Sequence, residues 1–565
     1  MLAKLVYQMS PMQERILEFQ GYNKKAVIND GEMRDMHNMS SDEYPCLYQR
    51  KPRGLYSNAY AEPTALLVKD KKLAVISEGK FYYDGVLYED LELSDDTQMV
   101  AINTKICFFP EKKYFVVKEQ DGKHEIGNIA EDVFIDDTVT VRMTGASLIF
   151  PSTYDFARKF KVGDAVSFST TDGKINMSAE IEAVTNYALT FQADTFTSYI
   201  TEAMDTGEST APAPAEGQLA APVISLVHED EESGSTYIEY DLVGFKVERT
   251  CPDLDYVLEY NNRLWGVSNK DNTIYASKLG DPCNWAYFQS TNLDSYYAEQ
   301  GTDGEWTGCA AYSAHILFFK EDCIHKVYGN KPANYQITTS QSHALEKGSH
   351  KSVAVINETV LYKSRLGIMA YSGGVPQLIS ENFGKEKFTD AIAGTDGMKY
   401  YLSALCNGEP ELLVFDMERM LWHKEDDKRV RDFCYHNGKV LFINAEDNLI
   451  YEMASDVPLQ DEKDIYWMVE FGPFDEFIEE KKVYSRMKMR LNLEEDSELN
   501  VYIKIGDGGW ELVQYIDNHT ERSQLVPIVP RRCDKFSIRL EGEGNCRIES
   551  LVREFRVSTM GKDVR

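Results

Sequence analysis

Residue types that could carry chemistry are plentiful in this chain, but they do not occur at the spacings that known reactions need. The sequence has 92 Asp and Glu, 10 His and 10 Cys. It contains no G-x-S-x-G nucleophile elbow, phosphate-binding P-loop, H-E-x-x-H metal motif or C-x-x-C pair. We therefore assign no catalytic, cofactor-binding or metal-binding residue, and we expect no enzymatic activity and no cofactor.

The histidines and cysteines favour structural roles. His343 and His350 would lie about 10 Å apart on a helix, too far to share one metal ion. The cysteines are scattered, and some, such as Cys107 and Cys309, lie inside apolar runs where a thiol packs as a small hydrophobe. We expect them to be reduced and buried, as in a protein that folds in a reducing cytoplasm.

Two carboxylate-bearing phrases resemble the Asp-box of sialidases, Asp303–Trp306 (DGEW) and Asp507–Trp510 (DGGW). Neither has the preceding hydroxyl residue at the usual place, and that box stabilises a hairpin rather than performing catalysis. Among so many carboxylates some pair will lie about 5–9 Å apart by chance. The sequence alone therefore does not identify any two carboxylates as a catalytic acid and base.

The charge balance argues against binding to nucleic acid or anionic lipid. The formal net charge is −32, and no run of five or more Lys and Arg occurs. Residues 1–20 include Lys4, Glu14, Arg15 and Glu18, so they lack the apolar core of a signal peptide, and no stretch approaches about 18 apolar residues. We expect a soluble protein without stable membrane insertion and without Sec export.

One short pattern recurs seven times between residues 65 and 452: an apolar run, a one- or two-residue turn rich in Asn, Gly, Asp or Lys, and a second apolar run. The copies are Ala65–Ser77, Met99–Phe109, Tyr256–Val267, Cys309–Phe319, Val353–Tyr362, Ala393–Ser403 and Phe433–Ile443. Most continue into a third apolar run, for example Lys80–Tyr83. Repeats of this size, each too small to bury both faces alone, predict a β-propeller of about seven blades.

A β-sandwich or mixed β protein with evenly spaced hairpins is the alternative fold. Sandwich strands should alternate apolar and polar residues because one face meets water. Runs such as Ala310–Phe319 and Leu412–Phe415 are apolar at nearly every position. Such runs favour sheets that are packed on both faces, as propeller blades are.

Two further regions are predicted outside the repeats. The second and third copies lie much further apart than one blade of about 40 residues, which leaves roughly 120 inserted residues. Strands expected at Thr138–Met143, Ala165–Thr170, Ile175–Val184 and Ala188–Phe191 predict a small β-barrel or sandwich there, followed by an Ala/Pro-rich linker at Thr206–Pro222.

The end of the chain shows period-2 alternation, which predicts an antiparallel β-sandwich with one wet face. Met487, Met489, Leu491 and Leu493 would face the core, and the residues between them would face solvent. We also expect a strand from residues 10–60 to pair with residues 430–455 and close the propeller. The predicted domains are 1–120 (closing segment and first blades), 121–245 (inserted β domain and linker), 246–459 (remaining blades) and 460–565 (sandwich).

Two stretches, Gly21–Arg53 and Tyr260–Trp285, resemble the β-propeller proteins of phage tails, namely the tail nozzle and the packaged-DNA stabilisation proteins. The matching elements are Asp30-Gly31-Glu32, Asp35, Asn38, Tyr44-Pro45, Arg50, Arg53, Asn262-Arg263-Leu264-Trp265-Gly266, Ile274-Tyr275-Ala276-Ser277, Gly280-Asp281-Pro282 and Trp285. The segment Val526–Asp534, followed by Arg539–Gly542, is similar to the end of stabilisation proteins from phages of Gram-positive bacteria. The inserted domain does not align to the family.

The resemblance implies a structural virion protein. It would form a homo-oligomer, a hexamer, in the tail or head-tail connector, assembled in the bacterial host cytoplasm and mounted on the portal and adaptor. This ring would line the DNA channel, retain packaged DNA and let it exit without reading its sequence. An acidic wall would suit that task because it repels phosphate.

Two other functions stay open at this point. A receptor- or glycan-binding protein of the virion would need exposed aromatic residues around a loop-built pocket. A glycan-degrading enzyme would need a cleft with two carboxylates and a perturbed pKa.

Overall fold

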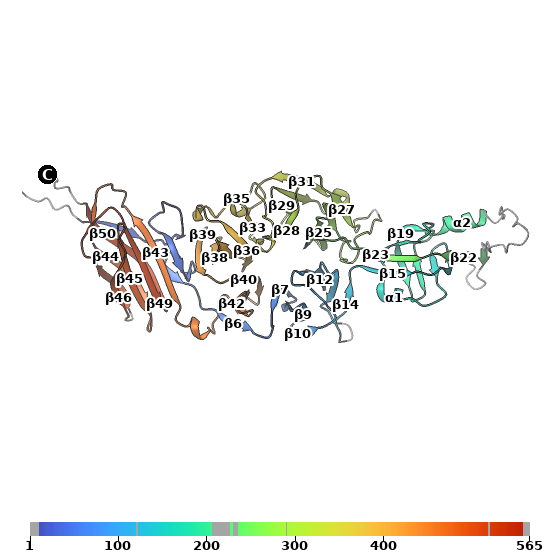
Figure 1. Ribbon diagram of the computed structural model, residues 1–565, viewed down its shortest axis with the longest axis horizontal. Coiled ribbons are helices and arrows are strands. Elements are labelled where there is room, and N and C mark those ends of the chain that lie inside the picture. Colours follow the sequence, from blue (N-terminus) through green and yellow to red (C-terminus); the bar gives the residue numbers. More distant parts are fainter. Residues whose placement is uncertain are drawn as a thin grey trace, which may run out of the picture. The chain divides into compact units, whose positions relative to one another are not determined.

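The computed structural model describes residues 11–119, 122–205, 227–229, 236–289, 291–517 and 520–557 (Figure 1). Its regular structure is almost entirely β. The helices are α1 (Phe156–Lys159), α2 (Thr197–Asp205), η1 (Pro332–Asn334), η2 (His350–Ser352), η3 (Glu381–Phe383) and η4 (Gln460–Glu462). The all-β class predicted from the sequence is therefore confirmed. No helix among the described residues combines the length and the apolar character needed to cross a membrane.

The described residues fall into two compact units. The first comprises the chain up to Asp96, Tyr312–His325 and the chain from Thr339 onward; the second comprises Thr97–Ala311 and Lys326–Thr338. The four-domain division given above stays a prediction, and the predicted linker Thr206–Pro222 lies outside the described residues.

Seven four-stranded sheets recur along the described chain. Four of them belong to the first unit: β7 (Pro63–Lys69), β8 (Lys72–Ser77), β9 (Lys80–Tyr83) and β10 (Val86–Tyr88); β32 (Ala354–Ile356), β33 (Thr359–Ser364), β34 (Gly367–Tyr371) and β35 (Gln377–Leu378); β36 (Phe388–Thr395), β37 (Lys399–Cys406), β38 (Glu409–Asp416) and β39 (Leu421–Asp426); and β40 (Val430–His436), β41 (Lys439–Asn444), β42 (Ile450–Glu452) and β6 (Gly54–Ser57).

Two more belong to the second unit: β11 (Gln98–Ile102), β12 (Lys105–Phe109), β13 (Lys113–Val116) and β14 (Ile126–Asn128); and β24 (Tyr256–Tyr260), β25 (Arg263–Ser268), β26 (Thr273–Ala276) and β27 (Tyr296–Glu299). The remaining sheet consists of β28 (Trp306–Tyr312), β29 (His315–Lys320), β30 (Cys323–Tyr328) and β31 (Gln336–Gln341). Each of the seven sequence repeats supplies the first two strands of one sheet.

The turns of these hairpins explain why the repeats fold as they do. The pairs Asp70-Lys71, Asn261-Asn262 and Asn357-Glu358 have positive φ at both positions. Two-residue hairpin loops whose twist matches that of the strands need this left-handed backbone, and Asn and Asp tolerate it best among residues with a side chain. The Asn- and Asp-rich turns seen in the sequence therefore set the strand register.

Neighbouring sheets of the first unit pack face to face. Leu66 and Val75 share a core with Leu441 and Ile443, which joins the β7–β10 sheet to the β40–β42 sheet. The β36–β39 sheet packs on the same β40–β42 sheet through a cluster that includes Val414 and Phe442. Strand β41 is buried at every position except Lys439. Burial of both faces explains why the apolar runs are continuous. A sandwich sheet, by contrast, has one face exposed to solvent and alternates apolar and polar residues.

The strand contact expected between residues 10–60 and 430–455 is confirmed. Strand β6 pairs antiparallel with β42, with Leu55 opposite Tyr451 and Gly54 opposite Glu452. A strand from the start of the chain thus completes the sheet that the last repeat begins.

The predicted C-terminal sandwich consists of two facing sheets, and strands from the start of the chain belong to both. One sheet holds β1 (Met12–Ile16), β50 (Cys546–Val557), β44 (Lys482–Leu493), β47 (Thr520–Pro527) and β48 (Arg532–Cys533); the other holds β2 (Gly21–Tyr22), β3 (Glu32–His37), β43 (Tyr466–Phe474), β49 (Phe536–Glu543), β45 (Glu498–Ile505) and β46 (Trp510–Ile516). A short pair, β4 (Met39–Ser40) and β5 (Tyr48–Gln49), follows β3.

The alternation predicted for this sandwich is correct. Met487 and Met489 are buried in a core that also contains Val501, whereas Lys488 and Arg490 are exposed. The sequence did not reveal that β1 pairs with β50 and β3 with β43. These N-terminal strands cover edges that would otherwise present unpaired backbone groups.

The inserted region forms one nine-stranded sheet. Its order is β15 (Glu131–Ile135), β23 (Phe245–Arg249), β18 (Ala165–Ser169), β19 (Asn176–Val184), β20 (Ala188–Phe191), β17 (Ser147–Ile149), β16 (Val139–Thr144), β22 (Thr236–Leu242) and β21 (Val227–Glu229). The four strands expected from the sequence are all present. One apolar core unites residues from distant strands of this path, such as Ile135 and Ile238, so the sheet folds over on itself.

A glycine in β36 offers a test of the close sheet packing. A Cβ at Gly394 would overlap the Cβ of Phe433 on the neighbouring sheet, whereas one at Gly374 would meet no other atom within 4 Å. We expect Gly394→Ala to lower the free energy of unfolding by about 1–3 kcal/mol through overpacking. Gly374→Ala, the matched control, should change it by less than about 0.5 kcal/mol. Chemical denaturation of both variants checks this, and equal midpoints would contradict the packing.

Candidate functional site

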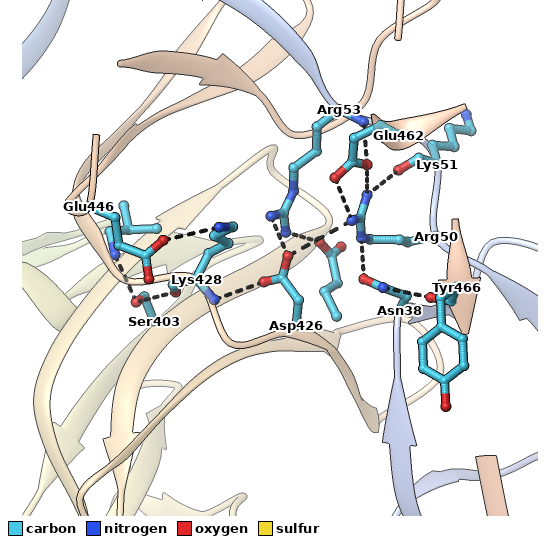
Figure 2. Close-up of polar contacts among 12 residues, drawn as sticks. Asn38, Arg50, Lys51, Arg53, Ser403, Asp426, Lys428, Glu446, Glu462 and Tyr466 are labelled. Carbon is cyan, nitrogen blue, oxygen red and sulfur yellow. Dashed lines mark hydrogen bonds and ion pairs between the residues drawn. The ribbon is translucent and has the colours of Figure 1, made fainter. Parts of the chain in front are cut away.

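A highly charged and largely buried site is a group of five side chains that we call the arginine cluster: Arg50, Arg53, Glu425, Asp426 and Glu462 (Figure 2). Arg50 donates two hydrogen bonds to the Glu462 carboxylate, at 2.6 and 2.9 Å. Arg53 donates to Asp426 and, at 3.1 Å, to Glu425. The two arginines are 5% and 3% exposed, so their charges need these partners.

The Asn38 side chain and two backbone groups complete the arginine cluster. Arg50 Nε donates to Asn38 Oδ1 at 2.7 Å, and Asn38 Nδ2 donates to the Tyr466 carbonyl at 2.7 Å. Asp426 Oδ1 accepts the backbone N–H of Lys428 at 3.0 Å. Three separate segments therefore meet here: the N-terminal segment, strand β39, and the chain that leads into β43.

The neighbouring acids of the arginine cluster have opposite pKa shifts. Burial raises the pKa of Glu425, and its arginine partners only partly offset that rise. Burial would also raise the pKa of Asp426, but Arg53 and Arg50 outweigh it and the pKa is lowered. The guanidinium of Arg53 also lies over the Phe442 ring, 5.2 Å from its centroid. Every acid is engaged by an arginine, so the arrangement suits a clamp rather than an acid and base pair.

Several residues that carry the family resemblance come together at this clamp and at a second one. Asn38, Arg50 and Arg53 belong to the arginine cluster. Asp30 binds Arg553, a fully buried residue that also holds Glu476 at 2.9 Å. These matched residues thus anchor the N-terminal segment.

The arginine cluster yields a stability prediction. Arg53→Leu leaves Glu425 and Asp426 buried without their main partner, which should lower the free energy of unfolding by about 3–5 kcal/mol. Arg429→Ala is the matched control because that side chain is 52% exposed and its Asp390 partner lies 3.8 Å away. The control should cost at most about 1 kcal/mol. Denaturant unfolding followed by tryptophan fluorescence measures both, and similar losses would refute the clamp.

A different site, which we call the aromatic hollow, lies in the second unit. It has a volume of about 400 Å³ and is lined by Phe288, Thr291, Asn292, Asp294, Ser295, Tyr296, Tyr297, Pro332 and Ala333. Phe288 is 51% exposed and Tyr297 is 62% exposed. Their rings lie edge to face, with centroids 5.8 Å apart and planes at 74°. Two large exposed rings beside a concave surface are the usual composition of a binding pocket.

A buried arginine holds the loop that forms one wall of the aromatic hollow. Arg263 is 1% exposed and donates to the backbone carbonyls of Ser277 and Asn292, each at 2.7 Å, and to that of Asp294. Burial lowers the pKa of this guanidinium. The carbonyl oxygens replace its water and keep the wall in one conformation.

Side chains of the same loop reinforce this wall. The Asp294 carboxylate accepts the backbone N–H groups of Gln289 at 3.0 Å and Thr291 at 2.9 Å. The ring of Tyr335 meets those of Trp265 and Tyr296 edge to face, with its centroid 5.0 Å from each of the other two. These aromatic contacts pack Tyr296, a lining residue, against the core behind it.

The aromatic hollow was not predicted from the sequence, in which no residue was assigned to a site. Its walls come from the loop before β27, from the start of β27 and from η1, which is distant from them in the chain, and no motif joins these segments. The only sequence signal was Arg263 within the segment that resembles phage propellers. An arginine that is buried after a hairpin turn needs hydrogen-bond acceptors, so the carbonyl groups of some other segment must point toward it.

The remaining sequence candidates lie apart from both sites. Asp507–Trp510 connects β45 to β46, and Asp303–Trp306 leads into β28. His343 precedes η2, whereas His350 begins it, so the two do not share a helix. The ten cysteines are free, and none is fully exposed. Within the described residues no group of three or more His, Cys, Asp and Glu could hold a metal ion.

Comparison with known proteins does not identify the chain. No protein-family model matches it, and no curated protein does. Among solved structures, BamB from Moraxella catarrhalis matches with 8% identity and a TM-score of 0.32, covering 73% of this chain and 99% of BamB. PorZ from Porphyromonas gingivalis matches with 8% identity and a TM-score of 0.25, covering 87% of this chain and 77% of PorZ.

An exo-β-1,3-galactanase from Phanerochaete chrysosporium matches with 10% identity and a TM-score of 0.21, covering 53% of this chain and 94% of that one. Similarity this low shows no function for this chain.

Proposed function

We propose that the seven four-stranded sheets close into a β-propeller and that the protein is a structural subunit of a phage tail nozzle or head-completion ring. The sheets support the fold because each repeats the same hairpin plus two further strands. Strand β6 supports closure because it completes the sheet begun by the last repeat. Closing a propeller by pairing strands from opposite ends of the chain resists opening of the ring.

The observation that carries the structural role is the arginine cluster. Three residues matched to the phage proteins, Asn38, Arg50 and Arg53, form a buried clamp and do not line an open reactive cleft. Such a clamp fixes how the N-terminal segment and the sandwich strands attach to β39. A protein that must hold its form under the pressure of packaged DNA needs joints of this kind.

The proposed ring is a homo-oligomer, a hexamer, located in the tail or head-tail connector of the virion and contacting the portal and adaptor. It lines the channel through which DNA passes. The net charge of −32 supports this passage because acidic walls repel phosphate and leave DNA free to slide.

Electron microscopy of the purified protein tests the assembly. We expect negatively stained particles to include rings with sixfold symmetry, and labelling of virions on this chain to mark the tail axis. Monomers at all concentrations, together with labels at the periphery of the tail, would contradict the proposal.

DNA binding tests the passive channel. We expect fluorescence anisotropy with a labelled 30-base-pair duplex to show no saturable binding at micromolar protein in about 150 mM salt, because few phosphates can be neutralised. Tight binding that weakens steeply with added salt would reveal a basic lumen instead.

A second candidate function, binding of a glycan or receptor by the virion, is favoured by one observation. The aromatic hollow has the exposed rings and loop-built wall that such a function needs. This site is compatible with a structural ring and is developed next.

A further inference from the structure

We propose that the aromatic hollow is a binding site for an uncharged saccharide, one pyranose unit of which stacks in the corner formed by Phe288 and Tyr297. The proposal does not depend on ring assembly, because every lining residue belongs to the second unit of a single chain. It rests on the shape of the corner, the rigidity of its walls and the charges that line it.

The two exposed rings are arranged to receive a compact ring. With planes at 74° and centroids 5.8 Å apart, Phe288 and Tyr297 form a corner rather than a row. A pyranose can lay its apolar C–H face on one ring and its edge against the other. A proline-rich peptide in an extended helix is read instead by a line of aromatic grooves, which this corner does not provide.

Polar ends are available beside the rings. Asn292 is exposed, and among the described residues its side-chain amide makes no hydrogen bond. The same holds for the hydroxyl of Tyr297, so both can meet the hydroxyl groups of a sugar. By contrast, the carboxylate of Asp294 is occupied by backbone N–H groups of its own loop and serves the wall.

The charges of the aromatic hollow select an uncharged ligand. No Lys or Arg lines it, and its one acid, Asp294, is 8% exposed. A phosphate, a sulfate or an acidic sugar would therefore meet no cation that could offset the free-energy cost of its desolvation. A cationic ligand would find no accessible carboxylate.

The walls are already in place before a ligand arrives. Arg263 fixes the carbonyls of Asn292 and Asp294, and on the opposite wall Asn334 holds Asn330 and Lys331 around Pro332. Little conformational entropy is then lost on binding. This small loss favours a higher affinity for a sugar that stacks on the two rings.

The test uses the full-length protein and a panel of neutral oligosaccharides built from glucose, galactose, mannose or N-acetylglucosamine. We expect saturation-transfer difference NMR to detect binding of at least one of them, and titration calorimetry to give its Kd. Phe288→Ala and Tyr297→Ala should each weaken that Kd about tenfold, or about 1.4 kcal/mol, because each removes an aromatic ring on which the sugar stacks. Asn292→Ala should weaken it by a smaller factor.

Tyr187→Ala is the matched control, because Tyr187 is also 51% exposed in the second unit but does not line the aromatic hollow. It should leave the Kd unchanged, and circular dichroism should show that all four variants are folded. A blocked octaproline peptide is the second probe. Binding of octaproline without any sugar, no binding of the panel at millimolar concentration, or sugar binding that survives the Phe288, Tyr297 and Asn292 substitutions would each overturn the proposal.

Discussion

Charge that is taken out of water must be paired, and this constraint organises the joints of the molecule. Arg53 is almost completely buried, so its guanidinium requires the carboxylates of Glu425 and Asp426. Arg50 in turn requires Glu462. Because those acids lie on β39 and on the chain entering β43, the N-terminal segment can dock in only one register. Strand β6, which follows Arg53 directly, is thereby brought to β42.

The same device recurs at other joints. Arg553 of β50 holds Glu476 and Asp30, which secures the N-terminal segment on the sandwich. In the second unit, Arg249 at the end of β23 donates to the carbonyls of Asn128 and Ile129 and pairs with Asp164. A guanidinium suits these positions because its planar fork of donors satisfies several acceptors from different segments at once. Arg263 donates to the backbone carbonyls of Ser277, Asn292 and Asp294, and the result is a preformed loop.

Hairpins were predictable because their determinants are local. The apolar runs and the Asn- or Asp-containing turns of Ala65–Ser77 or Tyr256–Val267 specify two antiparallel strands whatever surrounds them. The alternation at Met487 and Met489 likewise predicts one wet face. The pairing of β1 with β50 was not predictable, because five mostly polar and exposed residues at the start of the chain carry no sign of a partner more than five hundred residues away.

The sequence by itself determined the β class, the seven hairpins, the alternating sandwich and the acidic balance, since each follows from residue type and from spacing within one short segment. Only the tertiary structure decided which edges the N-terminal strands cover, which acids face Arg50 and Arg53, and that Phe288 and Tyr297 meet Pro332 around one hollow. The physical reason is that edge pairing, charge burial and pocket walls depend on segments far apart in the chain, and their matching is set by packing rather than by any local pattern.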